Sequence, residues 1–306
     1  MGDHEGLTIG LVGCGRWGSN ILRDLIALGC TVDVVIPSRS SAQEILDLGA
    51  NRVVHEPSAL TGVDGVILAT PSSTHADVID ACLALDVPLF VEKPFTTDAD
   101  RALGIAQRAP DSVFVMDKWR YHPGVEMLRE IVADGRLGPL RSIETVRVQD
   151  GMPHSDVDCT WILLPHDLSI ALEITGRQPR VTSADARWSD GRVVAVDADF
   201  DLGEGITMHS QFGIDANESR RSIRVIGDDA IATLTGGWED HVQIDDAHGT
   251  SAPIQISTPG ELPLLAELRC FLTHLRGGPA PRTSASDSAA IVRTIAELRE
   301  MIGAER

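Results

Sequence analysis

The chain has 306 residues, 43% of them hydrophobic, and a formal net charge of −19 at pH 7. This length predicts about two domains, each able to bury its own core. The negative charge argues against nucleic acid or an anionic membrane surface as the main partner. No apolar run approaches the roughly 20 residues of a membrane span. The first residues show no signal-peptide pattern and the five cysteines show no regular spacing, so we expect a cytoplasmic protein with reduced thiols.

A glycine-rich turn lies between the first predicted strand, residues 7–12, and a predicted helix with apolar residues at helical spacing. The turn consists of Gly13, Cys14, Gly15, Arg16, Trp17 and Gly18. A G-x-G-x-x-G sequence between a strand and a helix is typical of dinucleotide-binding proteins. Gly13 allows the tight turn, Gly15 lets a pyrophosphate approach the backbone, and Gly18 lets the helix pack on the strand. We therefore predict that residues 13–18 bind the phosphates of a dinucleotide at the helix amino terminus.

The second predicted strand, residues 31–36, ends without the acidic residue that would bind the ribose 2′-hydroxyl of NAD. The chain continues instead with Ser38, Arg39 and Ser40. A guanidinium between two hydroxyls suits a 2′-phosphate, so the sequence predicts NADP(H) as the preferred cofactor. Stacking of adenosine on Arg39 would also allow NAD(H). A solvated loop that caps the next helix is the remaining alternative.

Four more short apolar strands are predicted in the first part of the chain, at residues 52–55, 65–69, 87–91 and 112–116. With the helices between them they predict a doubly wound parallel sheet that ends near residue 118. Ligands bind beyond the carboxyl ends of such strands. We therefore expect Thr70, Pro71 and His75 to share one crevice with the glycine-rich turn. Glu92 and Lys93, which follow the fifth strand, belong to the same crevice.

Four segments, in this order, resemble the Gfo/Idh/MocA oxidoreductases. They are residues 13–18, residues 69–75, the triplet Glu92-Lys93-Pro94 and the segment Trp119-Arg120-Tyr121-His122-Pro123. The resemblance implies a Rossmann domain, which we place at residues 1–120, and an α+β domain at residues 121–306 that covers the site. In this family the open sheet of the second domain commonly makes the subunit contact. We therefore predict a homodimer or homotetramer, because a wide sheet with one exposed face needs a cover.

The part of the chain after residue 140 changes from alternating strands and helices to mostly strands. The predicted strands are residues 141–148, 180–188, 193–201, 206–212, 221–226, 230–234 and 241–245. Glycine- and aspartate-rich turns separate several of them. Two closing helices follow, with residues such as Leu268, Phe271 and Ile295 on their inward faces. The pattern predicts a large, mainly antiparallel sheet.

Three residues are candidates for catalysis. Lys93 follows a strand end, where its ammonium can stabilise the negative charge that develops on a substrate oxygen. His166, at the start of a predicted helix, occupies the position that the family resemblance implies for proton transfer. Tyr121, the only tyrosine, is either another acid or a packing residue at the domain junction.

The sequence departs from the resembled family four residues before His166. Sugar- and inositol-oxidising members carry an aspartate at that position, and this chain has Ile162. Asp156, Asp158 and Asp167 are candidate replacements. Because a general base loses its partner, the sequence slightly favours reduction of a carbonyl or imine over oxidation of an alcohol.

A metal site is the less favoured interpretation of the alternating His154, Asp156 and Asp158, because Gly151 and Pro153 indicate an irregular loop. The resembled hydride transfer needs no metal, and we predict none. The sequence as a whole predicts an NADP(H)-dependent oxidoreductase acting on a hydroxyl, carbonyl or imine of a small polar molecule. Sugar-like molecules and secondary metabolites are the candidate substrates. A non-catalytic NADP-binding sensor with the same fold is the alternative.

Overall fold

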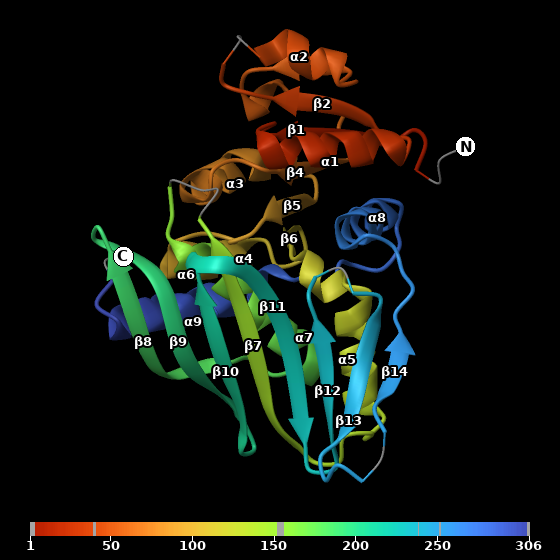
Figure 1. Ribbon diagram of the computed structural model, residues 1–306. Coiled ribbons are helices and arrows are strands. Elements are labelled where there is room, and N and C mark those ends of the chain that lie inside the picture. The colour runs from red at the N-terminus through yellow and green to blue at the C-terminus, as the bar shows by residue number, and fades with distance from the viewer. Residues whose placement is uncertain (1–3, 39–40, 152–155, 238, 251, 305–306) are drawn as a thin grey trace. The chain divides into compact units, whose positions relative to one another are not determined.

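The computed structural model describes residues 4–38, 41–151, 156–237, 239–250 and 252–304. The chain forms two compact units. The first unit comprises Met1–Lys118 and Leu264–Ala289, and the second comprises Trp119–Pro263 and Ala290–Arg306. The segment 264–289, blue in Figure 1, therefore belongs to the first unit although it follows the second unit's sheet in sequence.

The first unit is built on a six-stranded parallel sheet with strand order β3-β2-β1-β4-β5-β6. Its strands are β1 (Thr8–Val12), β2 (Thr31–Val35), β3 (Arg52–Val54), β4 (Gly65–Leu68), β5 (Leu89–Glu92) and β6 (Val113–Met116). Every neighbouring pair is parallel. Fully apolar strands such as β4 are stable here because both faces of a parallel sheet are covered. The loops after β1, β4, β5 and β6 consequently leave the same edge of the sheet.

Helices cover this sheet on both faces. They are α1 (Arg16–Ala27), α2 (Ala42–Asp47), α3 (His75–Leu83), α4 (Ala99–Arg108) and α8 (Pro263–Leu275). One core combines side chains of α1, α2 and α8 with alternate strand residues such as Ile67. In that core Phe271 of α8 stacks on Phe90 of β5 with ring centroids 4.9 Å apart. Val66 and Leu68 point to the opposite face by strand alternation, and α3 packs on β4 and β5.

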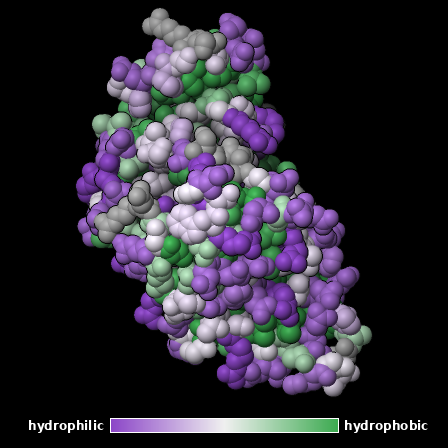
Figure 2. Space-filling view, turned by 60° about the vertical axis from the view of Figure 1, so that its left-hand side comes forward, coloured by the Kyte–Doolittle hydropathy of each residue, from purple (hydrophilic) through white to green (hydrophobic). Residues whose placement is uncertain are grey.

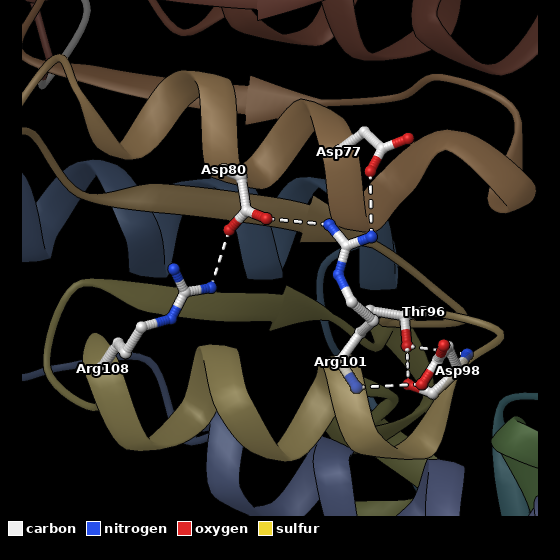
Figure 3. A network of polar contacts seen from close by, with 6 residues as sticks. All are labelled: Asp77, Asp80, Thr96, Asp98, Arg101 and Arg108. Atoms are coloured by element: carbon white, nitrogen blue, oxygen red, sulfur yellow. Dashed lines mark hydrogen bonds and ion pairs between the residues drawn. The ribbon is translucent and has the colours of Figure 1, made fainter.

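A network of ion pairs joins α3 to α4 (Figure 3). Arg101 Nη1 lies 3.0 Å from Asp77 and Arg101 Nη2 lies 2.8 Å from Asp80. Arg108 binds the second oxygen of Asp80 at 2.7 Å. Asp98 caps α4 by accepting a hydrogen bond from the Arg101 backbone N–H at 2.9 Å. The network holds together two helices that begin just after the predicted cofactor loops, 70–75 and 92–94.

The second unit is built on an eight-stranded sheet with order β14-β13-β12-β11-β7-β10-β9-β8. Its strands are β7 (Leu140–Asp150), β8 (Arg180–Ser189), β9 (Arg192–Gly203), β10 (Ile206–Gly213), β11 (Asp215–Gly227), β12 (Ala230–Thr235), β13 (His241–Asp246) and β14 (Ile254–Ser257). Only β7 and β10 pair in parallel among these described strands. The predicted fold class, a Rossmann sheet followed by a mainly antiparallel one, is confirmed.

Helices pack on one face of this second sheet. They are α5 (Pro123–Ala133), α6 (Cys159–Ile162), α7 (Leu164–Thr175) and α9 (Ala285–Met301), the last of which begins in the first unit. α7 packs on β10, and α5 packs on α7, β12 and β13. Along β7 the buried residues Ile143, Thr145 and Arg147 alternate with half-buried Glu144 and Val146. The first set faces the helices and the second set faces away from them.

The surface seen in Figure 2 is mostly hydrophilic, with hydrophobic residues showing between in smaller groups. This agrees with the net charge of −19. Within the part of the chain that the structure describes, no helix is long and apolar enough to cross a membrane.

Candidate functional site

The glycine-rich turn after β1 has the geometry that its sequence predicts. Gly13 has φ +92°, and a Cβ on it would lie 2.6 Å from the Ala69 carbonyl oxygen. A Cβ on Gly18 would lie 2.4 Å from the Gly13 carbonyl oxygen. A Cβ on Gly15 would meet no atom within 4 Å. The first two glycines are therefore required by packing, whereas Gly15 borders open space beside the start of α1, where a phosphate has room to approach.

Glu92 connects three loops at the carboxyl edge of the first sheet. Its Oε1 accepts a hydrogen bond from Trp17 Nε1 in the glycine-rich turn. Its Oε2 accepts a hydrogen bond from the Lys93 backbone N–H at 3.1 Å. Lys118, which follows β6, places its Nζ 4.6 Å from the centroid of the Trp17 ring. These contacts hold the glycine-rich turn, the catalytic candidate Lys93 and the end of β6 together.

Three buried carboxyl groups gather behind this link, from Glu92, Asp117 and Glu267 of α8. Burial raises the pKa of Glu92, and the Lys93 ammonium and the Trp17 hydrogen bond partly oppose that rise. Burial raises the pKa of Glu267 well above its usual range, and the charges of Glu92 and Asp117 raise it further. Glu267 Oε2 has no hydrogen-bond partner among the described residues. We infer that Glu267 keeps its proton to a higher pH than an exposed glutamate does.

His75, a predicted cofactor-binding residue, is buried between two loops. Its Nδ1 lies 2.8 Å from the Pro94 carbonyl oxygen and its Nε2 lies 2.9 Å from the Thr70 carbonyl oxygen. The ring therefore joins the loop after β4 to the loop after β5. Pro71 is exposed at the start of the short helix that precedes His75. A direct contact of these residues with a cofactor stays a prediction.

The remaining predicted cofactor residues lie at the ends of β1 and β2. Arg16 is the exposed first residue of α1, and Cys14 places its Sγ 3.8 Å from Ser19 Oγ. Burial raises the pKa of the Cys14 thiol. Ser38 is exposed. Arg39 and Ser40, which carry the prediction of NADP(H), lie outside the described residues.

The second unit contains the other catalytic candidates. His166 is the third residue of α7 and 8% exposed, with its ring edge-on to Trp119 at 6.3 Å between centroids. Trp119 also stacks on His122, with centroids 5.0 Å apart. Tyr121 is buried in the same short helical turn as Trp119. The segment that follows β6 thus supplies an aromatic environment for His166.

The candidate replacements for the family aspartate have other partners. The Asp167 carboxylate is fully buried, 2.8 Å from Arg147 Nε and 3.0 Å from Ser210 Oγ. Asp158 caps α6 and binds Arg299 Nη1 at 2.6 Å. Ile162 is buried at the end of α6, and Asp156 is exposed. His154, the third member of the alternating pattern, lies outside the described residues.

Two arginines near this group were not among the sequence candidates. Arg147 of β7 lies opposite Arg221 of β11 in the strand register. The Arg147 guanidinium lies 4.6 Å from the centroid of the Trp119 ring. Strand alternation alone places Arg147 on the same face as the apolar Ile143. A charged residue at such an inward-facing position of a predicted strand is the signal that could have identified Arg147 as a candidate.

Similarity to known proteins was found across the chain. Residues 7–115 match the Gfo/Idh/MocA oxidoreductase family, described as having an NAD-binding Rossmann fold. The chain is 26% identical over 311 residues to myo-inositol dehydrogenase from Streptomyces leeuwenhoekii, with 90% of each chain covered. These similarities support a Gfo/Idh/MocA oxidoreductase. This confirms the assignment made from its motifs.

Two further similarities are limited, one in the length that it covers and the other in sequence identity. UDP-N-acetylglucosamine 3-dehydrogenase from Acidithiobacillus ferrooxidans is 29% identical over 178 residues, which span 56% of this chain and 56% of that relative. A 3-ketoreductase from Actinomadura kijaniata, solved with TDP-benzene and NADP, has a TM-score of 0.86 at 19% identity, covering 97% of this chain and 98% of its own. The structural likeness shows the shared fold.

Glu267→Gln should remove a pH dependence from the stability of the protein. The pKa of Glu267 is raised in the folded state above an unfolded value of about 4.3. The folded state therefore binds this proton more tightly, and stability falls as the pH rises from the unfolded pKa through the folded one. Glutamine cannot ionise, so the Tm of the variant relative to wild type should increase as the pH rises above the unfolded value of about 4.3.

Thermal unfolding over this pH range measures the effect. Glu297→Gln, at an exposed carboxyl of α9, is the matched control and should show no such trend. A Tm difference for Glu267→Gln that stays constant or shrinks as the pH rises would mean that Glu267 is ionised in the folded protein.

Proposed function

We propose that the protein is an NADP(H)-dependent oxidoreductase that transfers a hydride to or from a hydroxyl, carbonyl or imine carbon of a small polar molecule. The main support is the link through Glu92, which joins Trp17 of the glycine-rich turn to Lys93. The predicted cofactor turn and the Lys93 backbone are thereby held at one sheet edge. The open space beside Gly15 and the start of α1 suit the pyrophosphate of NADP(H).

The bound nicotinamide supplies or accepts the hydride. The residues of this chain bind, orient and handle charge. Lys93 hydrogen-bonds the substrate oxygen or nitrogen and stabilises the negative charge that develops there. His166 delivers or accepts the proton. Tyr121, buried beside Trp119, is the alternative proton donor.

We propose reduction as the favoured direction. Ile162 cannot orient an imidazole, and the Asp167 carboxylate binds Arg147 and Ser210. A general base without a carboxylate partner is weaker, whereas donation of one proton to the product of hydride addition asks less of His166. The same observation at Ile162 favours a non-catalytic NADP-binding sensor as the second candidate function. NADPH oxidation with a panel of ketones and imines separates the two.

Variants of Lys93 and His166 test catalysis. Lys93→Met should lower kcat about 100- to 1000-fold, as for other donors aimed at developing charge. His166→Ala should lower kcat about 100- to 10,000-fold and leave NADPH binding intact. The double variant should be less impaired than the product of the two effects, because both residues serve one step. His248→Ala, at an exposed position in the turn after β13, is the control.

Steady-state kinetics and NADPH titration measure these effects. Normal turnover in His166→Ala would remove it from the mechanism and direct attention to Tyr121. Normal turnover in both single variants would contradict the proposed mechanism altogether.

Arg39→Ala tests the preference for NADP(H). A charge-assisted contact with the 2′-phosphate is worth about 1.5–3 kcal/mol, so NADPH binding should weaken by about one to two decades and NADH binding much less. Dissociation constants for both cofactors measure this. Arg293→Ala, at an exposed position of α9, controls for the lost charge. Equal losses for both cofactors, or none, would contradict the assignment.

We propose that a second copy of the chain covers the outer face of the second sheet, where Val146 is half-buried between polar neighbours. Light scattering should give a mass two or four times 32.8 kDa. Val146→Glu should shift the protein toward the monomer, whereas Leu48→Glu, at an exposed position of the first unit, should not. A wild-type monomer at micromolar concentration would refute the proposal.

A further inference from the structure

The second unit places two arginines side by side on the helix-covered face of its sheet. Arg147 and Arg221 are direct cross-strand partners of β7 and β11, so their side chains leave the same face. Arg221 Nη1 also lies close to Gly237, where an added Cβ would be 3.5 Å from Nη1 and 3.3 Å from the Trp119 ring. Like charges directly opposite each other destabilise a sheet. The arrangement therefore needs a compensating negative charge.

Only part of that charge is present in the described structure. Asp167 is the carboxylate whose charge acts on Arg221, and its two oxygens bind Arg147 Nε and Ser210 Oγ. Arg221 forms no ion pair and donates no side-chain hydrogen bond to any described residue. Arg147 uses only Nε in such a bond, which leaves its two amino groups for another acceptor. Two guanidinium charges thus share one carboxylate.

The charge imbalance affects the pKa of Arg221. Burial lowers the pKa of its guanidinium, the charge of Arg147 lowers it further, and Asp167 partly opposes both. An arginine stays protonated in proteins even so. An anion that both guanidinium groups can bind lowers the electrostatic energy of such a half-buried pair of cations.

We propose that Arg221 and Arg147 form an anion-binding subsite for a carboxylate or phosphate group of the substrate. The subsite lies beside Trp119, whose ring is also the neighbour of His166. The proposal rests on the proposed function in one respect, that the ligand is the substrate of the oxidoreductase. It assigns that substrate to the class of small polar molecules with an anionic oxygen group.

Direct binding tests this subsite without turnover. The full-length protein, saturated with NADP⁺ so that the cofactor's own phosphate sites are filled, is titrated with sodium phosphate, sodium D-glucuronate and neutral D-glucose. Ionic strength is kept constant, because screening alone changes anion binding. Calorimetry and tryptophan fluorescence measure Kd for wild type and the variants Arg221→Gln, Arg221→Lys and Arg220→Gln. Arg220, exposed on the opposite face of β11, is the matched control.

Wild type should bind phosphate or glucuronate, and Arg221→Gln should weaken that binding about 10- to 100-fold. Arg221→Lys keeps the charge without the planar fork and should lie between the two. Arg220→Gln should match wild type. Binding of phosphate alone assigns a phosphate-bearing substrate, and binding of glucuronate alone assigns a carboxylate. Two results would overturn the subsite. One is that wild type binds neither anion, and the other is that Arg221→Gln and Arg220→Gln change the Kd equally.

Turnover measured separately distinguishes this failure from that of the proposed function. Hydride transfer to neutral compounds, without Arg221-dependent anion binding, would overturn the subsite and leave the oxidoreductase. Arg221-dependent anion binding without hydride transfer to any tested compound would leave the subsite and contradict the oxidoreductase.

Discussion

The buried carboxylate of Glu92 is the interaction on which the first unit's site depends. A carboxylate at the end of a buried strand is costly unless donors and cations compensate it. Trp17 Nε1 and the Lys93 N–H donate to it, and the Lys93 and Lys118 ammonium groups lower its pKa from the value that burial alone would produce. These partners come from the loops after β1, β5 and β6. Satisfying one charge therefore also fixes the predicted cofactor turn relative to Lys93.

A second ionised carboxylate is unfavourable beside Glu92. Glu267 reaches it from α8, and its pKa is raised by burial and by Glu92 and Asp117. The second unit has the opposite imbalance, because Arg147 and Arg221 share Asp167. In a chain with a net charge of −19, a half-buried excess of positive charge is a local exception. The proposed anion subsite would account for this exception, because guanidinium groups form strong charge-assisted hydrogen bonds with anions.

The sequence predicted most of the fold because strands, helices and tight turns depend mainly on residues that are close together in the chain. The predicted strand 206–212 is β10 (Ile206–Gly213), and the turn glycines Gly13 and Gly18 meet the backbone atoms that the motif requires. The elements that were not anticipated include α5, which begins at Pro123 directly after the junction motif, and β14, whose four residues lack a buried alternation. The site was predicted less completely, since Glu267 and Arg221 acquire their meaning only through neighbours distant in sequence. The sequence did not indicate that His75, a predicted cofactor residue, would join the Pro94 and Thr70 carbonyl groups of two loops.

The proposed anion subsite offers one explanation for two features of the second unit, the apolar Ile162 and the arginine pair at Arg221. The family resemblance leads us to expect an aspartate four residues before His166, whereas residue 162 is apolar and buried, and Asp167 binds Arg147 and Ser210. The second unit therefore lacks one negative charge near His166 and has one positive charge too many at Arg221. A substrate that carries an anionic oxygen group supplies the missing charge itself. On this argument a neutral polyol fits the site less well than an acid or a phosphate ester, because only the charged ligand satisfies both arginines.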